Sequence, residues 1–225
     1  MKKRFYGVRS GYQPGVYNSW EQCRAQVEGC PNSEYKGFAT RHEAEEYLKP
    51  AGPSGVESPS SSESRKNVII YTDGACRGNP GPGGYGVVLM HGKHRKELSA
   101  GFRRTTNNRM EILACIAALS ALKEPCDVTI YSDSKYVVNA MTQSWALKWR
   151  SRGWKRRLKN GDMEDALNPD LWARMLELCD LHRVHFIWVR GHDGNEGNER
   201  CDALARAAAA GNNLGIDDPY ERPAR

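Results

Sequence analysis

Two aspartates in the same local sequence are the first candidates for chemistry. Asp73 ends the apolar run Val68–Asp73, Asp133 ends Val128–Asp133, and each follows a tyrosine and a hydroxyl residue. If a helical crossover joins these strands, they run parallel and can be neighbours, which places both side chains at one edge of a sheet. Ligands of open α/β sheets bind at that edge. Taken singly, Asp73-Gly74 is also typical of a turn, and Asp133 could cap a following helix.

Two further carboxylates and a histidine could join this edge. Glu111 falls in the first turn of a predicted helix, where its alternative role is a capping box with Asn108. Asp202 begins an alanine-rich helical run, where a solvated carboxylate is the ordinary expectation. His192 lies in a loop with glycine on either side, at 191 and 194, where a histidine is usually solvated.

A cluster of these four carboxylates would have a definite chemistry. Their mutual repulsion makes such a cluster costly unless cations neutralise it. Ligand sets made only of carboxylates suit Mg²⁺ or Mn²⁺ rather than zinc. Two such ions, about 3.5–4 Å apart, can stabilise both the attacking and the leaving oxygen of a phosphodiester. The pattern therefore suggests metal-dependent phosphoryl transfer.

The elements that must position these residues follow a strand–helix–strand order. We predict strands at Val68–Asp73, Tyr85–Met90, Lys96–Phe102, Val128–Asp133 and Val184–Val189, a turn at Asn79–Gly84, and helices at Asn108–Leu122 and Asn198–Ala210. The helix Asn108–Leu122 is apolar nearly all round, so it should be buried. This order predicts an α/β fold, a mixed sheet with helices on its faces.

A smaller unit precedes this body. Strand-like pieces at Phe5–Arg9, Val16–Asn18 and Tyr35–Ala39, with capping-box patterns that begin at Ser19 and Thr40, predict a three-stranded sheet with two helices. A stretch rich in Pro, Gly and Ser then predicts a flexible linker. We therefore expect a small domain at 1–49, a linker at 50–66, the main domain at 67–210 and a disordered tail at 211–225.

Composition limits the class of protein. With 39% hydrophobic and 27% charged residues in a chain of 225, we expect a soluble globular protein. The net charge of +6 permits a nucleic-acid partner without proving one. The 7 cysteines include no Cys-x-x-Cys pair, which favours reduced, buried thiols over a zinc site. Without a signal peptide or an apolar run of roughly 18 residues, we expect no membrane association and a cytoplasmic location, with a nuclear form as the alternative. Nothing in the sequence indicates oligomerisation, so we expect a monomer.

One basic run has the character of a nucleic-acid surface. Between 148 and 159 every charged residue is basic: Lys148, Arg150, Arg152, Lys155, Arg156, Arg157 and Lys159. Such a run is usually a solvated face, but three tryptophans, Trp145, Trp149 and Trp154, are interleaved with it and favour a surface that follows phosphates. We expect some of these rings to be core, and we predict a contact at Trp154 and its flanking charges.

Four blocks resemble the motifs of type 1 ribonuclease H: Tyr71–Gly86, Thr105–Glu111, Ser132–Val137 and Gly191–Ala205. Their order and spacing agree with that family across Val68–Ala210. The resemblance implies a ribonuclease H-like fold with a five-stranded mixed sheet. It implies hydrolysis of the RNA strand of RNA–DNA hybrids, with 5′-phosphate and 3′-hydroxyl products. It also implies two Mg²⁺ ions, or Mn²⁺ as an alternative, held by Asp73, Glu111, Asp133 and Asp202.

The same resemblance assigns residues to the substrate. His192 matches a mobile histidine that assists proton transfer or product release, although Asp193 beside it departs from the family pattern. Asn79, Asn107 and Asn108 match contacts to the hybrid, where the 2′-hydroxyl must be sensed; the alternative is turn and cap chemistry. The basic run matches a protrusion that grips the DNA strand.

The N-terminal unit resembles the hybrid-binding domain of many ribonucleases H through Phe5–Gly11, Gly15–Tyr17, Trp20–Val27 and Tyr35–Thr40. The resemblance implies that Tyr6, Trp20 and Tyr35 contact DNA sugars and that Lys36 holds a phosphate. Gly37 stands where a second lysine is common, so this grip should be weaker. The alternative is that Trp20 and Tyr35 are simply core.

Three other functions are weighed against this one. A non-catalytic hybrid-binding protein is disfavoured because all four carboxylates are present. A nuclease or integrase of the same fold class that acts on DNA alone is disfavoured by Asn107-Asn108 and by the N-terminal unit. A basic structural protein would be excluded by a magnesium requirement for activity.

Overall fold

The structure is a computed structural model that describes residues 5–10, 14–27, 33–48, 65–158, 160–191 and 193–222. The chain divides into two compact units, Met1–Ser61 and Ser62–Arg225. Each unit is described separately below.

The first unit contains an antiparallel sheet of three strands in the order β2-β1-β3. Its elements are β1 (Phe5–Ser10), β2 (Gly15–Tyr17), α1 (Trp20–Val27), β3 (Glu34–Phe38) and α2 (Arg41–Leu48). Both capping boxes form as predicted: Gln22 N donates to Ser19 Oγ at 3.3 Å, and Glu43 N donates to Thr40 Oγ1 at 3.3 Å. The predicted three-stranded sheet with two helices is confirmed.

The two helices of this unit lie against opposite faces of the sheet. Val8 is fully buried in a small cluster with Cys23 and Val27 of α1. Gly7, the preceding residue of β1, faces the other way, and a Cβ there would lie 2.9 Å from the ring of Tyr47 in α2. The core of this unit is therefore thin on each side.

The second unit contains a five-stranded mixed sheet in the order β10-β7-β4-β5-β6. The strands are β4 (Lys66–Cys76), β5 (Gly81–His91), β6 (His94–Thr105), β7 (Cys126–Ser132) and β10 (Arg183–Trp188). β4 pairs in parallel with β7 and β7 with β10, whereas β4–β5 and β5–β6 are antiparallel. The predicted mixed five-stranded sheet is confirmed, with β4 beginning at the last residue assigned to the linker.

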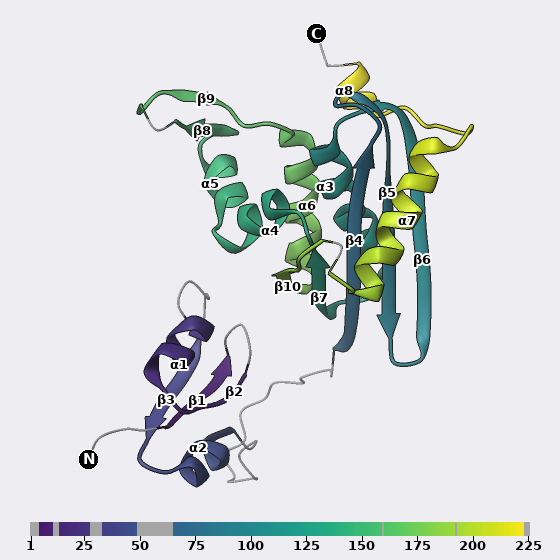
Figure 1. Cartoon of the computed structure of the whole chain (residues 1–225). Helices are drawn as coiled ribbons and strands as arrows, with labels where there is room; N and C mark the ends of the chain where they lie inside the picture. The colour runs from purple at the N-terminus through teal and green to yellow at the C-terminus, as the bar shows by residue number, and fades with distance from the viewer. Residues whose placement is uncertain are drawn as a thin grey trace. The chain divides into compact units, whose positions relative to one another are not determined.

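Helices cover both faces of this sheet. They are α3 (Asn107–Ser120), α4 (Lys135–Thr142), α5 (Trp145–Ser151), α6 (Pro169–Leu181) and α7 (Glu196–Ala210). Helix α7 lies against β4, β5 and β6, while α3 lies on the other face with α6 behind it (Figure 1). As predicted, α3 is buried on most of its surface, including Ile112 and Leu119. At Gly84 in β5 a Cβ would lie 2.7 Å from the carbonyl oxygen of Ala205, so glycine allows α7 to approach the sheet.

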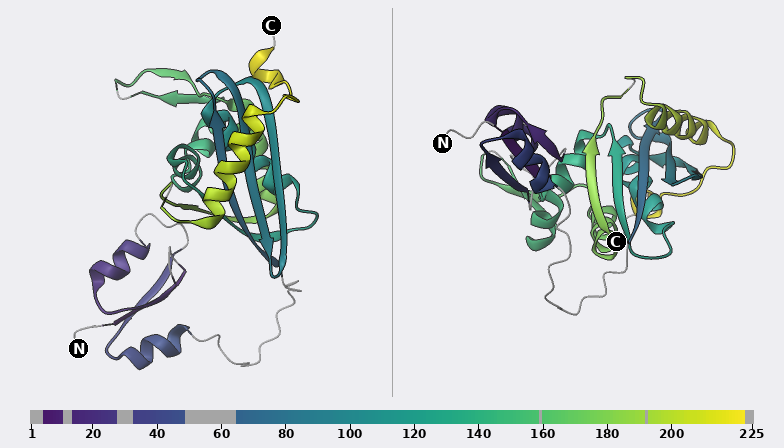
Figure 2. Two further views of the ribbon diagram at one scale, coloured as in Figure 1. Left: turned by 45° about the vertical axis from the view of Figure 1, so that its right-hand side comes forward. Right: turned by 90° about the horizontal axis from the view of Figure 1, so that it is seen from below.

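A two-stranded hairpin, β8 (Lys155–Arg157) and β9 (Met163–Asp165), projects from the helical side of this unit (Figure 2). It carries part of the basic run noted in the sequence. The cysteines in the described part of the chain are all free. None of the helices described there combines the length and the apolar character needed to cross a membrane.

The segment after Ala210 differs from the disordered tail that we predicted. Residues 211–222 are described and lie against the end of β6: Gly215 N donates to Gly101 O at 2.8 Å, and Arg103 N donates to Gly215 O at 3.0 Å. The segment ends in a short helix, α8 (Asp218–Glu221). Just before it, the side chain of Asp217 is 2% exposed and forms an ion pair with buried Arg109 at 2.6 Å. Polar composition suggested disorder, but this buried ion pair anchors the segment.

One local prediction about the site elements was wrong, and one alternative role is excluded. β4 continues through Asp73 to Cys76 instead of ending at Asp73, because it pairs with β5 as far as Cys76↔Gly83. The N-cap of α3 is Thr106, whose side chain accepts from Arg109 N. Glu111 therefore forms no capping box with Asn108, and its carboxylate is available for another role.

Candidate active site

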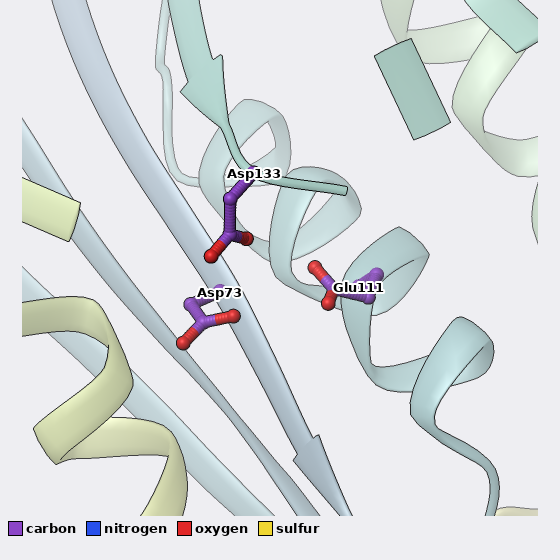
Figure 3. Close-up of side chains that lie close together, drawn as sticks. All are labelled: Asp73, Glu111 and Asp133. Atoms are coloured by element: carbon purple, nitrogen blue, oxygen red, sulfur yellow. The ribbon is translucent and has the colours of Figure 1, made fainter. Parts of the chain in front are cut away.

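Three of the four predicted carboxylates converge at one place on the sheet. Asp73, Glu111 and Asp133 each offer an oxygen that lies within 4.8 Å of the others (Figure 3). Asp73 comes from β4, Glu111 from α3 and Asp133 from the residue after β7. Asp73 and Glu111 are buried. The central strands of the sheet and the N-terminal part of a helix thus build one acidic cluster.

The pairing register of β4 and β7 explains why the two aspartates meet. Tyr71 is paired with Tyr131, and Thr72 with Ser132. Because parallel strands keep equivalent residues at the same level, the next residues, Asp73 and Asp133, lie side by side. The shared sequence pattern of the two strands therefore becomes a shared position in space.

A glycine brings the third carboxylate to this edge. A Cβ on Gly74 would lie 2.5 Å from the backbone nitrogen of Glu111, so only glycine lets β4 and α3 approach this closely. Asn107 Nδ2 donates to Glu111 Oε1 at 3.3 Å. Glu111 Oε2 is buried and has no hydrogen-bond partner among the described residues. A buried carboxylate oxygen without a partner is the kind of atom that a cation satisfies.

Asp133 is held by neighbours on two sides. Asn198 Nδ2 donates to its Oδ2 at 3.3 Å, and Trp188 Nε1 donates to its backbone oxygen at 3.0 Å. A Cβ on Gly191 would lie 2.6 Å from Asp133 Oδ2, so glycine at this position leaves room for the carboxylate in its present direction. The ammonium of Lys135 lies 4.9 Å from the centroid of the Trp188 ring. These contacts fix the direction of the Asp133 carboxylate.

The cluster carries an electrostatic cost in the absence of a cation. Burial, and then the charge of Asp133, raise the pKa of Asp73 to about 7. Burial, together with the charges of Asp73 and Asp133, raises the pKa of Glu111 well above its usual range. A divalent cation would relieve both effects, because it supplies opposite charge to oxygens that are already in place. The residues present therefore fit a hard, oxygen-binding metal ion.

Asp202, the fourth predicted carboxylate, is in the same cleft but outside this close group. It lies on α7, and its carboxylate forms an ion pair with Arg206 at 2.8 Å. Both residues line an open cleft of about 540 Å³ together with Asp73, Glu111 and Asp133. Asp202 is therefore close enough to serve the site, and Arg206 is its present partner.

The predicted asparagines border the cleft. Asn107 and Asn108 line it, and Asn107 N donates to Asn79 Oδ1 at 3.2 Å. Two cations of the cleft, Lys135 and Arg206, were missed by sequence reasoning. Their spacing from the predicted carboxylates could have identified them. Lys135 follows Asp133 by two residues, and Arg206 is one helical turn after Asp202.

Two predicted residues, His192 and Lys159, lie outside the described residues. The role of His192, and any influence of Asp193 on it, stay predictions.

The basic run is partly neutralised by acids from a different strand. Lys155 pairs with Asp165 at 3.0 Å, and Arg156 pairs with Glu164, both acids belonging to β9. The rings of Trp145, Trp149 and Trp154 pack against the hydrophobic core of the second unit. The run is therefore less positive than its sequence indicates, and only part of the predicted contact residue Trp154 is accessible.

The first unit presents an aromatic cluster. The ring of Trp20 lies 5.6 Å from that of Tyr6 and 5.7 Å from that of Tyr35, between centroids. Trp20 is 40% exposed and Tyr35 is 43% exposed, so neither is a simple core residue. Lys36 follows Tyr35 in β3 and points to the opposite face, where its ammonium lies 5.8 Å from the Phe38 ring. The structure thus groups the three aromatics and separates Lys36 from them.

The fold and the site together define an α/β protein with an acidic metal-type site where the parallel pairing of β4 with β7 ends. A family model described as RNase H matches residues 65–210, and the chain belongs to this family. A second model, described as the Ribonuclease H1 N-terminal domain, matches residues 4–48.

Named relatives support this assignment. The chain is 58% identical to "Ribonuclease H" of Syntrophus aciditrophicus over 171 residues, which cover 76% of this chain and 94% of that protein. It is 62% identical to "Ribonuclease H" of Desulforamulus reducens over 152 residues, which cover 68% and 93%. Among solved structures, LC9-RNase H1 is similar, with a TM-score of 0.60 and 32% identity over 73% of this chain and 84% of that one.

Proposed function

We propose that this chain is an endoribonuclease that hydrolyses the RNA strand of RNA–DNA hybrids. The observation that carries the proposal is the acidic cluster of Asp73, Glu111 and Asp133, within 4.8 Å, in a chain of the RNase H family. The alignments to two relatives named Ribonuclease H cover 94% and 93% of those proteins, which supports the proposal.

Mg²⁺ is the proposed cofactor. Asp73, Glu111, Asp133 and Asp202 would hold two ions, with Mn²⁺ as an alternative, because all their ligand atoms are carboxylate oxygens. When bound, such ions lower the pKa of an attacking water and stabilise the charge that develops on the leaving oxygen. The unpartnered Glu111 Oε2 and the raised pKa of Asp73 support this assignment.

The proposed reaction is a hydrolysis of one phosphodiester bond. Water attacks the phosphorus, the bond from phosphorus to the 3′ oxygen breaks, and the 3′ oxygen takes up a proton. The products carry a 5′-phosphate and a 3′-hydroxyl. His192 is proposed to assist proton transfer or product release, a role that rests on its match to the family motif.

The choice of RNA is proposed to come from the asparagines at the cleft. Asn107 and Asn108 line it, and Asn79 is joined to Asn107 by a hydrogen bond. An amide side chain both donates and accepts hydrogen bonds, as a 2′-hydroxyl does. Duplex DNA lacks this hydroxyl and would leave the amides unsatisfied.

The first unit is proposed to bind the hybrid through Tyr6, Trp20 and Tyr35, with Lys36 as a weaker phosphate contact. The composition of residues 50–66 suggests a linker that spans on the order of 20–25 Å root-mean-square. Binding by one unit would then raise the effective concentration of the other at the same hybrid. We further propose that the protein acts as a monomer in the cytoplasm.

Cleavage of end-labelled substrates tests the proposal. The intact chain, with Mg²⁺, is compared on hybrid, duplex DNA and duplex RNA, and then with chelator in place of Mg²⁺. The expected result is cleavage of the RNA strand of the hybrid alone, a loss of activity with chelator, and a loss of about a hundredfold or more in Asp133→Asn. Equal cleavage by Asp133→Asn would refute the carboxylate assignment. Hybrid binding without cleavage would favour a binding protein.

A further inference from the structure

Arg109 forms a buried ion-pair cluster that the proposed chemistry does not use. It lies on α3 two residues before Glu111, and its side chain is 3% exposed. It donates to both carboxylate oxygens of Asp217, at 2.6 Å from Nε and 2.7 Å from Nη2. It also donates to both oxygens of Asp170, at 3.0 Å and 2.7 Å. Because a buried charge left without its partner is strongly unfavourable, this cluster fixes the guanidinium in place.

Asp217 contacts both ends of a short stretch that borders the cleft. Thr105, the last residue of β6, donates from Oγ1 to Asp217 Oδ2 at 2.7 Å. Arg109 binds the same carboxylate from the first turn of α3. Between Thr105 and Arg109 lie only three residues, two of which are Asn107 and Asn108. One carboxylate therefore sets the separation between the strand end and the helix start.

The segment that supplies Asp217 is itself anchored. Arg103 Nε donates to Glu221 Oε2 at 2.7 Å, and Asp217 N donates to Glu221 Oε1 at 3.2 Å. With the backbone bonds of Gly215 to the end of β6, these contacts hold residues 211–222 against the second unit. This segment lies beyond residues 65–210, which the family model matches.

Glu111 has a separate support. Its backbone lies directly against Gly74 of β4, so the central strand positions it. Loss of Asp217 should therefore disturb Asn107 and Asn108 more than it disturbs the carboxylates.

From these contacts we infer that the C-terminal segment 211–222 is a positioning element for hybrid recognition: Asp217, through Arg109 and Thr105, sets where Asn107 and Asn108 meet the substrate. Asp217 itself touches no substrate. The inference rests on the proposed function, because it assigns the segment a role in recognising the hybrid.

The test is Asp217→Asn in the full chain. Asparagine keeps the shape of the side chain but removes the charge that Arg109 and Thr105 share. In steady-state cleavage of a labelled hybrid, we expect KM to rise about tenfold while kcat stays within about twofold, because recognition and not chemistry is disturbed. Hydrogen exchange should quicken in peptides that cover 105–110 and stay unchanged over 66–76.

Two further variants keep the test decisive if Asp217→Asn folds poorly. Thr105→Val removes one of the two contacts and leaves the Arg109 ion pair, so KM should rise by about threefold. Arg222→Gln is the matched control: it breaks the exposed pair of the same segment with Asp218 and should leave both KM and the exchange of 105–110 unchanged. Thermal melting shows that each variant is folded at the assay temperature.

The outcomes separate the inference from the proposed function. If the unaltered chain fails to cut any hybrid, the proposed function fails, and the inference fails with it. If the unaltered chain cuts the hybrid and folded Asp217→Asn or Thr105→Val has an unchanged KM, the segment only stabilises the fold and the inference is overturned. A fall in kcat at constant KM overturns it as well.

Discussion

The rings of Tyr71 and Tyr131 stack at 5.0 Å between centroids with 18° between their planes, on two parallel strands and two residues before Asp73 and Asp133. The stack fixes the register of β4 against β7. A slip of one residue would turn the Asp133 side chain to the other face of the sheet. The aromatic pair thus helps to define the site without touching its carboxylates.

Gly191→Ala should damage the site while leaving the fold intact. The new Cβ would lie 2.6 Å from Asp133 Oδ2, and the end of that side chain can turn away more easily than backbone can move. We expect Mn²⁺ affinity, measured by calorimetry, to fall about tenfold, because one ligand of the cation is displaced. Gly211→Ala, at the end of α7, is the matched control. Unchanged affinity in folded Gly191→Ala would show that Asp133 does not bind the ion.

Asp73→Asn should make the metal-free protein more stable at neutral pH. The pKa of Asp73 in the folded protein is raised to about 7 from its usual 3.8. A raised carboxyl pKa leaves stability intact below about pH 4 and reduces it as the pH rises towards 7. In chelator, the variant should therefore gain on the order of 1–4 kcal/mol over the unaltered protein between pH 4 and 8.

Denaturant titrations at several pH values measure this difference. With saturating Mg²⁺ the unaltered protein should become the more stable of the two. The bound ion stabilises the folded protein that has the Asp73 carboxylate more than it stabilises Asp73→Asn. If the difference in the free energy of unfolding between the two proteins stays constant across this pH range, the raised pKa of Asp73 is contradicted.

Removing the acids of β9 should strengthen substrate binding. Glu164→Gln with Asp165→Asn frees Arg156 and Lys155 from their ion pairs, so two more cations can meet phosphates. We expect hybrid affinity at low salt to rise about threefold or more, with a steeper dependence on salt concentration. Fluorescence anisotropy across a salt series measures both. Glu177→Gln on α6, which frees Arg174 from a similar exposed pair, is the control; an equal gain in binding free energy for each negative charge removed would mean that only net charge matters.

Trp20→Ala should weaken binding to long hybrids without changing the chemical step. Trp20 is the central ring between Tyr6 and Tyr35, and each base or sugar contact of an exposed aromatic contributes about 1–3 kcal/mol. Single-turnover cleavage at saturating enzyme should be unchanged. Lys36→Gln, on the opposite face, should have a smaller effect. A larger loss in Lys36→Gln than in Trp20→Ala would place the binding surface on that face instead.

Much of the second unit could be predicted because its signals are local. The runs that end in Asp73 and Asp133 are continuous and apolar, and a crossover rule places parallel strands together. The buried character of α3 follows from its composition alone. The resemblance to known motifs then assigned the carboxylates to one site, and three of them meet in the structure.

What could not be predicted depends on contacts between distant residues. Asp217 pairs with Arg109, 108 positions earlier, and nothing in the polar tail marks that aspartate as buried. The acids opposite Lys155 and Arg156 lie on a strand that the basic run does not include. The start of α3 could not be predicted for a related reason, since Thr106 and Asn108 are both good N-cap residues and only the path of β6 selects between them.

The strand order has a consequence for how the enzyme emerges during synthesis. The antiparallel strands β4, β5 and β6 are consecutive in the chain and can pair once residue 105 has left the ribosome. One face of these three strands is covered mainly by α7, about 90 residues later, and that same helix carries Asp202. Until α7 has been synthesised, the apolar face of these strands is exposed to solvent. Exposed apolar surface of this kind is what chaperones bind. Helix α7 thus covers the sheet and brings Asp202 to the cleft, so both contributions depend on the same late part of the chain.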